Sequence, residues 1–370
     1  MASIHYIGMD VHSTSYTLCC YNPENGKVHH VQTVEPDPLQ IVKYLQGLRR
    51  LIGGDAQFLC GYEAGCMGYS LYQQLTGCGI ECVILAPTTM AVPTAARRIK
   101  NDKRDAATIA KCLAYQTYSP VHVPTPEDEQ VKEFIRMRDD HMIALKTCKQ
   151  QILAFCLRHG HRFTDAKNWT ALHLKWLRNL PLNTMHREVV DEYLLTYDHL
   201  ADKLKRLDKR IEELAAQDRF RDDVKKLSCF LGVKTHTALA VIAEVSDFHR
   251  FPSAGQFAAF LGLVPGEQSS GDKQTRRGIT KAGNVHLRSL LVESAQAYSR
   301  GKAGYKSKVL RARQAGNSPQ VVAHADKGNL RLRQRFYKMV MRGVRHNVAK
   351  TAVARELACF MWGMMTDHIA

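Results

Sequence analysis

The sequence predicts an α/β domain with a mixed β-sheet, followed by a mainly α-helical region. Three predicted strands open the chain, and further strands then alternate with helices, which is the order that builds a mixed sheet. From about residue 124 to 227 glycine nearly vanishes and charge rises, while apolar residues recur at helical spacing. These observations place an α/β unit first and helical units after it.

The strands of the first unit are predicted from short apolar runs at residues 4–9, 15–21, 27–34, 58–62 and 81–85. Asn25-Gly26, in the turn between the second and third runs, is a hairpin signal. Apolar residues at helical spacing predict helices over 37–51 and 69–75. This order of elements resembles the ribonuclease H fold.

Composition favours a polyanionic partner. The 370 residues contain 52 Lys plus Arg against 35 Asp plus Glu, a net charge of +17, and nucleic acid is the default partner for such an excess. No apolar run approaches the length of a membrane span, and the first residues lack the features of a signal peptide. We therefore expect no membrane association and a cytoplasmic location.

The eleven cysteines form no Cys-x-x-Cys pair, which is typical of reduced and mostly buried thiols. Cys78 and Cys82 have a loose metal-like spacing but lack a second pair of ligands. The sequence therefore does not favour zinc at this pair.

The chemistry of the first unit is carboxylate chemistry. Asp10 ends the first predicted strand, and Glu63 ends the strand after the first helix. Asp102 and Asp105 are three residues apart, so on a helix they share one face. Taken singly, these residues fit a strand-end cap or a pair favoured by a helix dipole. Taken together, four carboxylates at one edge of a sheet indicate two bound Mg²⁺ or Mn²⁺ ions.

An unbroken apolar seam in the middle region predicts a coiled coil. Its members step by three and four residues over about three heptads: Val190, Tyr193, Tyr197, Leu200, Leu204, Leu207, Ile211 and Leu214. One interpretation is a homo-oligomer, a dimer or tetramer. The other is one arm of an intramolecular helical hairpin, with the amphipathic helix of residues 131–156 as its partner.

Residues 228–251 predict two helices joined by a turn and resemble a helix-hairpin-helix motif. In that motif helix N-terminal amides and a lysine, here Lys234, bind a phosphate without reading sequence. The usual Pro-Gly-Ile-Gly turn is Phe230-Leu-Gly-Val here, with one glycine missing. A plain structural hairpin therefore stays open as the alternative.

The stretch from Gly262 to Asn284 is a glycine-punctuated basic loop that holds Ser269 and Ser270. The stretch contains the cations Lys273, Arg276, Arg277 and Lys281, and Arg288 follows shortly after it. Such a loop can place a hydroxyl group against a phosphate, although Ser-Gly pairs in polar loops are often simple turns.

Several motifs together resemble one family of prokaryotic insertion-sequence transposases. Gly8-Met-Asp-Val-His12, Tyr62-Glu-Ala-Gly65 and Asn101-Asp-Lys-Arg-Asp-Ala106 are similar to its Asp-Glu-Asp-Asp (DEDD) site, in a domain similar to RuvC-type Holliday-junction resolvases. Residues 257–265 and 278–288 resemble the C-terminal domain of the same family. The resemblance implies three parts: a DEDD domain over 1–123, a coiled-coil region over 124–226 and a serine-containing transposase domain over 227–370.

The resemblance further implies a recombinase that excises and inserts its own element in a prokaryotic cell, associated with the nucleoid. A serine would attack a DNA phosphate with help from metal-bound Asp10, Glu63, Asp102 and Asp105. Ser269 is preferred over Ser270, because related sequences keep the first hydroxyl of the pair. An element-encoded "bridge RNA" would choose the target. The implied nucleic-acid contacts are Lys100, Lys103, Arg104, Lys234, Lys273, Arg276, Arg277, Lys281 and Arg288.

Two other classes remain as alternatives. One is a metal-dependent, structure-specific endonuclease of the Holliday-junction resolvase type, in which the serine loop only binds DNA. The other is a non-catalytic nucleic-acid-binding protein. Tyr298 and Tyr305 are the fallback nucleophiles of the recombinase interpretation.

Overall fold

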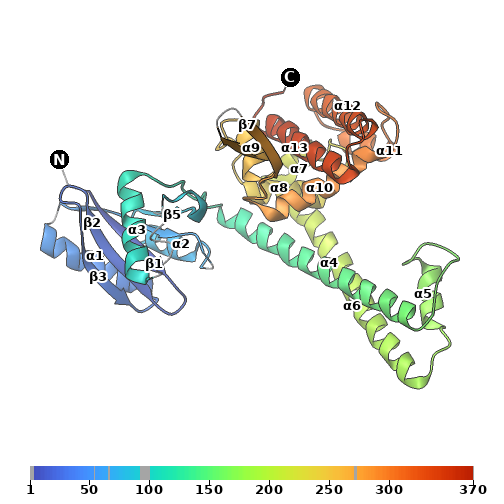
Figure 1. Cartoon of the computed structure of the whole chain (residues 1–370), viewed down its shortest axis with the longest axis horizontal. Helices are drawn as coiled ribbons and strands as arrows, with labels where there is room; N and C mark the ends of the chain where they lie inside the picture. The colour runs from blue at the N-terminus through green and yellow to red at the C-terminus, as the bar shows by residue number, and fades with distance from the viewer. Residues whose placement is uncertain (1–3, 54, 66, 92–100, 271–272, 370) are drawn as a thin grey trace. The chain divides into compact units, whose positions relative to one another are not determined.

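The computed structural model describes residues 4–53, 55–65, 67–91, 101–270 and 273–369, and only the backbone of 267–270 and 273–277. The chain divides into two compact units, residues 1–123 and 124–370, which are described separately here. Figure 1 shows a sheet with helices in the first unit and an almost entirely helical second unit.

The first unit contains one five-stranded mixed sheet in the order β3-β2-β1-β4-β5. β1 pairs antiparallel with β2 and parallel with β4, and β5 continues the parallel side. The strands are β1 (Ile4–Val11), β2 (Tyr16–Asn22), β3 (Lys27–Val34), β4 (Gln57–Glu63) and β5 (Cys82–Leu85). The five predicted strands are confirmed, and their order fits a ribonuclease H-like fold.

Helices cover both faces of this sheet. α1 (Pro38–Ile52) and α2 (Ser70–Gly77) pack their buried residues against Ile7 and Met9 of β1. A short 3-10 turn, Pro87–Thr89, follows β5. α3 (Asp102–Tyr115) lies on the other face and contacts β1, β2 and β4. Because side chains alternate along a strand, the even-numbered residues of β1 point toward α3.

A glycine in β1 lets α3 come this close. A Cβ atom added at Gly8 would fall far inside van der Waals contact with the Ala106 carbonyl oxygen, and within 2.9 Å of Ala110 Cβ. Ala106 and Ala110 are both fully buried at this contact. Small residues on both partners therefore bring the first turns of α3 directly over the end of β1.

The second unit begins with a long helical hairpin. α4 (Pro126–Arg158) and α6 (Thr184–Ala215) pack along each other, and α5 (Ala171–Arg178) lies near their distal end (Figure 1). The helices that follow are α7 (Asp218–Leu227), α8 (Thr235–Val245), α9 (Ala254–Phe260), α10 (Val285–Ser294), the 3-10 turn η3 (Ala295–Ser299), α11 (Lys308–Gln314), α12 (Pro319–Met341) and α13 (His346–Met365).

The apolar seam predicted in the middle region faces α4 of the same chain. Val190, Tyr197 and Leu204 of this seam are buried in one cluster with Ile152 and Phe155 of α4. Its partner is thus the preceding α-helical element α4, as in the intramolecular alternative, because each of the two amphipathic helices buries the apolar stripe of the other. The seam no longer requires a second subunit, and oligomerisation stays a prediction.

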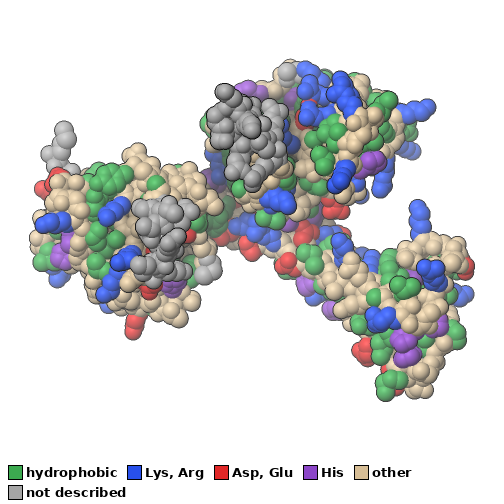
Figure 2. All heavy atoms as spheres, in the orientation of Figure 1, with side chains coloured by type: hydrophobic (Ala, Val, Ile, Leu, Met, Phe, Trp, Pro, Cys, Tyr) green, Lys and Arg blue, Asp and Glu red, His purple; other side chains and the backbone are tan. Residues whose placement is uncertain are grey.

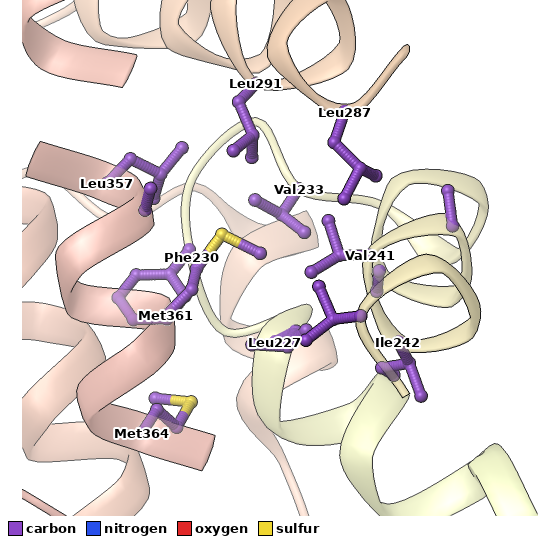
Figure 3. Packing of buried hydrophobic residues seen from close by; sticks show 14 of the residues in the cluster. Leu227, Phe230, Val233, Val241, Ile242, Leu287, Leu291, Leu357, Met361 and Met364 are labelled. Carbon is purple, nitrogen blue, oxygen red and sulfur yellow. The ribbon is translucent and has the colours of Figure 1, made fainter. Parts of the chain in front are cut away.

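One contiguous core holds α7 to α13 together. Figure 3 shows side chains from the α7–α8 turn, α10 and α13 meeting in it, among them Val233, Leu291 and Met361. The last helix, α13, is apolar and packs onto this core, and Trp362 Nε1 donates a hydrogen bond to the Phe251 carbonyl oxygen at 3.1 Å. This core supports the element that carries the two serines.

That element is a β-hairpin, whereas the sequence analysis expected a loop. β6 (Pro265–Ser270) pairs antiparallel with β7 (Lys273–Ile279). The two strands were not predicted because both are polar, and neither has the alternating apolar residues of a half-buried strand. The signal that could have found them is Gly271-Asp272 between two segments of similar length, a pair typical of two-residue hairpin turns.

The close approach of α3 generates a stability prediction. Gly8→Ala should push α3 off the sheet and lower the free energy of unfolding by at least about 1–3 kcal/mol, the usual cost of overpacking. Urea unfolding followed by circular dichroism measures the change.

Gly77→Ala is the matched control, because a Cβ atom at Gly77 would meet nothing within 4 Å. That change should raise stability by up to about 1 kcal/mol, the usual advantage of Ala over Gly in a helix. Equal effects of the two substitutions would contradict the packing described for α3.

Candidate active site

The pairing of β1 with β4 brings two of the predicted carboxylates to one edge of the sheet. Met9 pairs with Tyr62 in the parallel register, so Asp10 and Glu63 are the next aligned positions on adjacent strands. Aligned residues on parallel strands project to the same face. Glu63 is exposed and Asp10 is half-buried.

The first turn of α3 supplies the other two carboxylates. Asn101 caps the helix, and its side chain accepts a hydrogen bond from the Lys103 amide at 3.0 Å. Asp102 and Asp105 follow within the first turn, as predicted, where the helix dipole favours negative charge. Because α3 rests on Gly8, this turn lies beside the end of β1.

Three side chains converge closely enough to hold one metal ion. The ligand atoms of Asp10, His12 and Asp102 all lie within 4.8 Å of one another. Asp10 Oδ2 is buried without a hydrogen-bond partner, and His12 Nε2 lies 3.4 Å from it. Burial raises the pKa of Asp10; His12 opposes this rise, and the charges of Asp102 and Asp105 add to it. A bound cation would relieve both the unpaired oxygen and the repulsion among carboxylates.

The donor set fits a divalent cation. Oxygen ligands suit Mg²⁺ and Mn²⁺, and an imidazole is compatible with Mn²⁺. His12 was missed as a possible ligand by the sequence analysis, although it directly follows β1 and stands two residues after Asp10. Glu63 and Asp105 stand at the same end of the sheet but outside the closest group of three.

The predicted basic contacts beside this cluster are partly visible. Lys103 and Arg104 are exposed on the first turn of α3, where they can approach a phosphate. Lys100 lies outside the described residues.

In the second unit, backbone contacts close the base of the serine hairpin. Gly262 and Gly283 have φ angles of +65° and +76°, and a side chain at either would collide with the opposite segment. The Thr280 amide donates to the Val264 carbonyl, and the Asn284 amide donates to the Phe260 carbonyl, both at 2.9 Å. Ser269 pairs with Gln274 and Ser270 with Lys273, so both serines stand at the far end of the hairpin.

Two of the predicted cations lie at this base. Lys281 is exposed. Arg288 Nη1 instead donates to the carbonyl oxygens of Leu261 and Ala282, at 3.0 and 3.1 Å, so this side chain ties the two segments together. Nothing is described of the side chains of Lys273, Arg276 and Arg277, which stay predicted contacts.

A partly buried polar network anchors the chain directly after the hairpin. His286, at the start of α10, contacts Glu244 Oε1 of α8 through Nδ1 at 2.6 Å and Asp139 Oδ2 of α4 through Nε2 at 2.7 Å. Arg136 donates two hydrogen bonds to Glu244, at 2.8 and 2.9 Å, and Asn284 donates a third. The network therefore joins α4, α8 and α10 beneath the hairpin.

Charge balance explains how these groups are kept ionised. Burial would lower the pKa of His286, but hydrogen bonds and the charges of Asp139 and Glu244 outweigh it and raise this pKa to about 9. Burial would raise the pKa of Glu244, but bonds from His286, Arg136 and Asn284 lower it to about 2. His286 is therefore protonated between two carboxylates at neutral pH. The sequence analysis missed this network, because its members come from three distant segments.

The helix-hairpin-helix turn is engaged inside the protein. The Leu231 amide donates to Asn329 Oδ1 at 2.8 Å, and Asn329 Nδ2 donates to the Cys229 carbonyl at 3.2 Å. A Cβ atom at Gly232 would collide with the Ser294 carbonyl oxygen. These contacts favour the plain structural hairpin over a phosphate-binding turn, although Lys234 is exposed at the start of α8.

The tyrosine alternative loses one of its two residues. Tyr298 is fully buried and its hydroxyl donates to Asn329 Oδ1 at 3.0 Å, so it cannot reach DNA. Tyr305 is exposed.

The prediction of reduced and mostly buried cysteines is confirmed within the described residues, where every cysteine is free and only Cys78 is exposed.

Basic side chains are prominent on the second unit. Figure 2 shows Lys and Arg gathered over α11 and α12, where the exposed cations include Lys308, Arg311, Arg335, Lys338 and Arg342. No helix within the described residues is long and apolar enough to span a membrane.

The carboxylates at one end of an α/β sheet fit a DEDD-type domain, and comparison with known proteins identifies the family. A family model described as "Transposase", for the DEDD transposases of IS110, matches residues 7–159. A second, described as "Transposase IS116/IS110/IS902 family", matches residues 224–311.

The chain is 32% identical to a putative transposase, y4qE, of Sinorhizobium fredii, over 98% of this chain and 88% of the relative. It is 31% identical to the transposase for insertion sequence element IS1533 of Leptospira borgpetersenii, over 90% and 95%. It is 29% identical to the transposase for IS1111A of Coxiella burnetii, over 81% and 79%. The chain belongs to the IS110/IS116/IS902 family of transposases. It is a DNA transposase, and its DEDD domain indicates use of a divalent metal.

The charged network predicts a pH dependence of stability. The pKa of His286 is raised on folding, so its contribution is complete below its unfolded pKa of 6.5 and is lost as pH rises through about 9. His286→Gln should therefore lower the unfolding free energy by on the order of 2 kcal/mol near pH 6, and by much less above pH 9. Urea unfolding from pH 6 to 10 measures the difference.

His249→Gln is the matched control, because His249 is exposed and contacts only Asp247 at the surface. Its effect should stay near zero at every pH. A loss for His286→Gln that does not change with pH would contradict the protonated state assigned to His286.

Proposed function

We propose that this transposase excises and inserts its own insertion sequence by forming a covalent bond between a hairpin serine and DNA. Residues 1–123 supply the carboxylate cluster, residues 124–226 the helical arm, and residues 227–370 the serine hairpin. The observation that carries the proposal is the convergence of Asp10, His12 and Asp102. It occurs in a chain that belongs to a family of DEDD transposases.

Asp10, Glu63, Asp102 and Asp105 would hold the metal, Mg²⁺ or Mn²⁺, with His12 beside them. When bound, such an ion polarises a phosphate and stabilises the charge that develops on the attacking or leaving oxygen. The chain's own contribution is positional: the register of β1 with β4 and the packing of α3 fix where the carboxylates stand. Lys103 and Arg104 would hold the DNA backbone beside them through charge.

The serine step conserves the energy of the DNA bond. The serine hydroxyl oxygen attacks the phosphorus and loses its proton, while the bond to the leaving sugar oxygen breaks and that oxygen gains a proton. The product is a phosphodiester between serine and DNA. A sugar hydroxyl of the second DNA then attacks the same phosphorus and restores the free serine. Because the number of phosphodiester bonds is unchanged, strand exchange needs neither ATP nor water.

Two features support Ser269 and Ser270 for this role. Both stand at the far end of a hairpin whose base is fixed by glycine contacts, Arg288 and the His286 network. The hairpin sequence also carries Arg276, Arg277 and Lys281, which can neutralise a phosphate. Ser269 remains our first choice, as the family resemblance implies.

We also propose that an RNA from the element directs the choice of DNA. The net charge of +17 and the exposed cations of α11 and α12 provide the electrostatic capacity to bind two nucleic acids at once. Sequence would then be read by base pairing, while the protein contacts backbones.

The nucleophile can be tested by trapping. Purified protein is incubated with its element ends, the RNA transcribed from them and Mg²⁺, then denatured and examined for DNA bound to protein. Ser269→Ala should abolish the adduct, while Ser289→Ala should not. Ser289 is a suitable control because it is exposed and its hydroxyl bonds only to its own helix, at Val285. Loss with Ser270→Ala alone would move the role to Ser270, and free DNA ends without any adduct would support the endonuclease instead.

The carboxylate cluster is tested separately. Asp10→Asn should reduce adduct formation by about a hundredfold or more, since electrostatic groups at a reacting phosphate contribute on this scale. Asp55→Asn, an exposed carboxylate after α1, should leave it unchanged. DNA binding measured in parallel should be equal in both variants. Full activity of Asp10→Asn would identify a protein whose carboxylates take no part in the chemistry.

A further inference from the structure

A second group of metal-ligand side chains lies in the first unit, away from the carboxylates. His5 of β1, Cys20 of β2 and His29 of β3 place their ligand atoms within 4.8 Å of one another. His5 is odd-numbered like Ile7 and Met9, so it lies on the face covered by α1, opposite to Asp10 and α3. It also stands at the start of β1, whereas Asp10 stands near its end. The two groups are therefore separate sites.

A bulge in β3 brings His29 into this group. Leu18 pairs with Gln32, and a regular ladder would then place His30 opposite Cys20. The register instead shifts, and His29 pairs with Cys20. His30 accommodates this register shift with a φ angle of +50°. The Tyr44 hydroxyl donates a hydrogen bond to the His30 carbonyl oxygen at 2.7 Å. Bulges commonly re-aim a side chain in this manner.

The ligand atoms of the three side chains meet in the buried interior of the unit. His29 Nδ1 is buried and has no hydrogen-bond partner. Burial, together with the nearby His30 and His5, lowers the pKa of His29. Cys20 Sγ lies 3.9 Å from His5 Nδ1, and both residues are almost fully buried. Burial raises the pKa of Cys20 to about 12.

We propose that His5, Cys20 and His29 form a binding site for one late first-row divalent cation, Zn²⁺ in the cell. Two imidazoles and a thiolate match the preference of Zn²⁺, and three protein ligands leave one of its four usual positions for solvent. Ligands at about 2.0–2.3 Å from the ion lie roughly 3.5 Å apart, so the group must contract by about 1 Å. Side-chain rotation can supply this movement without shifting the strands.

Such an ion would join the three antiparallel strands at the end of the sheet opposite to the carboxylates. Binding releases one proton, from Cys20, as the sulfur–metal bond forms. Mg²⁺ and Mn²⁺ prefer oxygen ligands, so the two sites would select different ions and would not compete. The role is structural stabilisation of the folded state by mass action, independent of the transposition chemistry.

Cobalt tests the site, because a thiolate bound to Co²⁺ gives a near-ultraviolet charge-transfer band that oxygen ligands do not give. The full-length protein titrated with Co²⁺ should develop this band with one equivalent, and Zn²⁺ should remove it. The band should disappear in Cys20→Ser and His29→Gln. It should persist in Cys78→Ser, which removes the exposed thiol, and in His30→Gln, which removes the neighbouring exposed ring.

Because Cys20 is fully buried, circular dichroism must first show that Cys20→Ser is folded. His29→Gln, at a half-buried position, keeps the test decisive if it is not. Zn²⁺ should also raise the melting temperature of the wild type but not that of His29→Gln. Absence of the band in folded wild-type protein would overturn the proposal, and so would a band that survives His29→Gln. Either result would leave a thiol–imidazole hydrogen bond as the role of the group.

Discussion

The contact between α3 and β1 at Gly8 is the constraint on which the first unit depends. At this contact the backbone of α3 lies directly against the backbone of β1, because the helix residues that face Gly8 are the small Ala106 and Ala110. Without this approach Asp102 would stand a side chain's width further from Asp10. Packing energy therefore sets the separation of groups that repel one another, because the repulsion among carboxylates is overcome by apolar burial elsewhere in the same helix.

The second unit solves a different problem, which is how to fix a polar hairpin that has little apolar surface of its own. Its base is closed by two glycines in the left-handed region and by Arg288. Beneath it lies a protonated histidine between two carboxylates, with Arg136 and Asn284 completing the bonds of Glu244. A buried charged group whose partners are all present gives a defined geometry, although replacement by apolar residues is often no less stable. The network therefore fixes the orientation of the hairpin more than it raises the stability of the unit.

The sequence could predict what depends on local patterns. Alternating and apolar runs identified every strand of the first sheet, and the spacing of Asp102 and Asp105 placed both on the first turn of α3. It could not reveal His12 as a neighbour of Asp102, nor the network of Asp139, Glu244 and His286, because those contacts join residues far apart in the chain. The polar strands β6 and β7 were not predicted either, because their pairing is fixed by backbone contacts at the base of the hairpin.

The position of Asp139 on α4 has a consequence for how proteins of this kind can exchange parts. A cut between residues 226 and 227 falls at the end of α7, where the sequence changes character. It would nevertheless separate Glu244 and His286 from Asp139 and Arg136. The hairpin module therefore includes α4, which begins at Pro126, far upstream of the hairpin at Pro265. A functional chimera between two relatives should inherit residues 124–370 as one block, with its natural junction beside Val123.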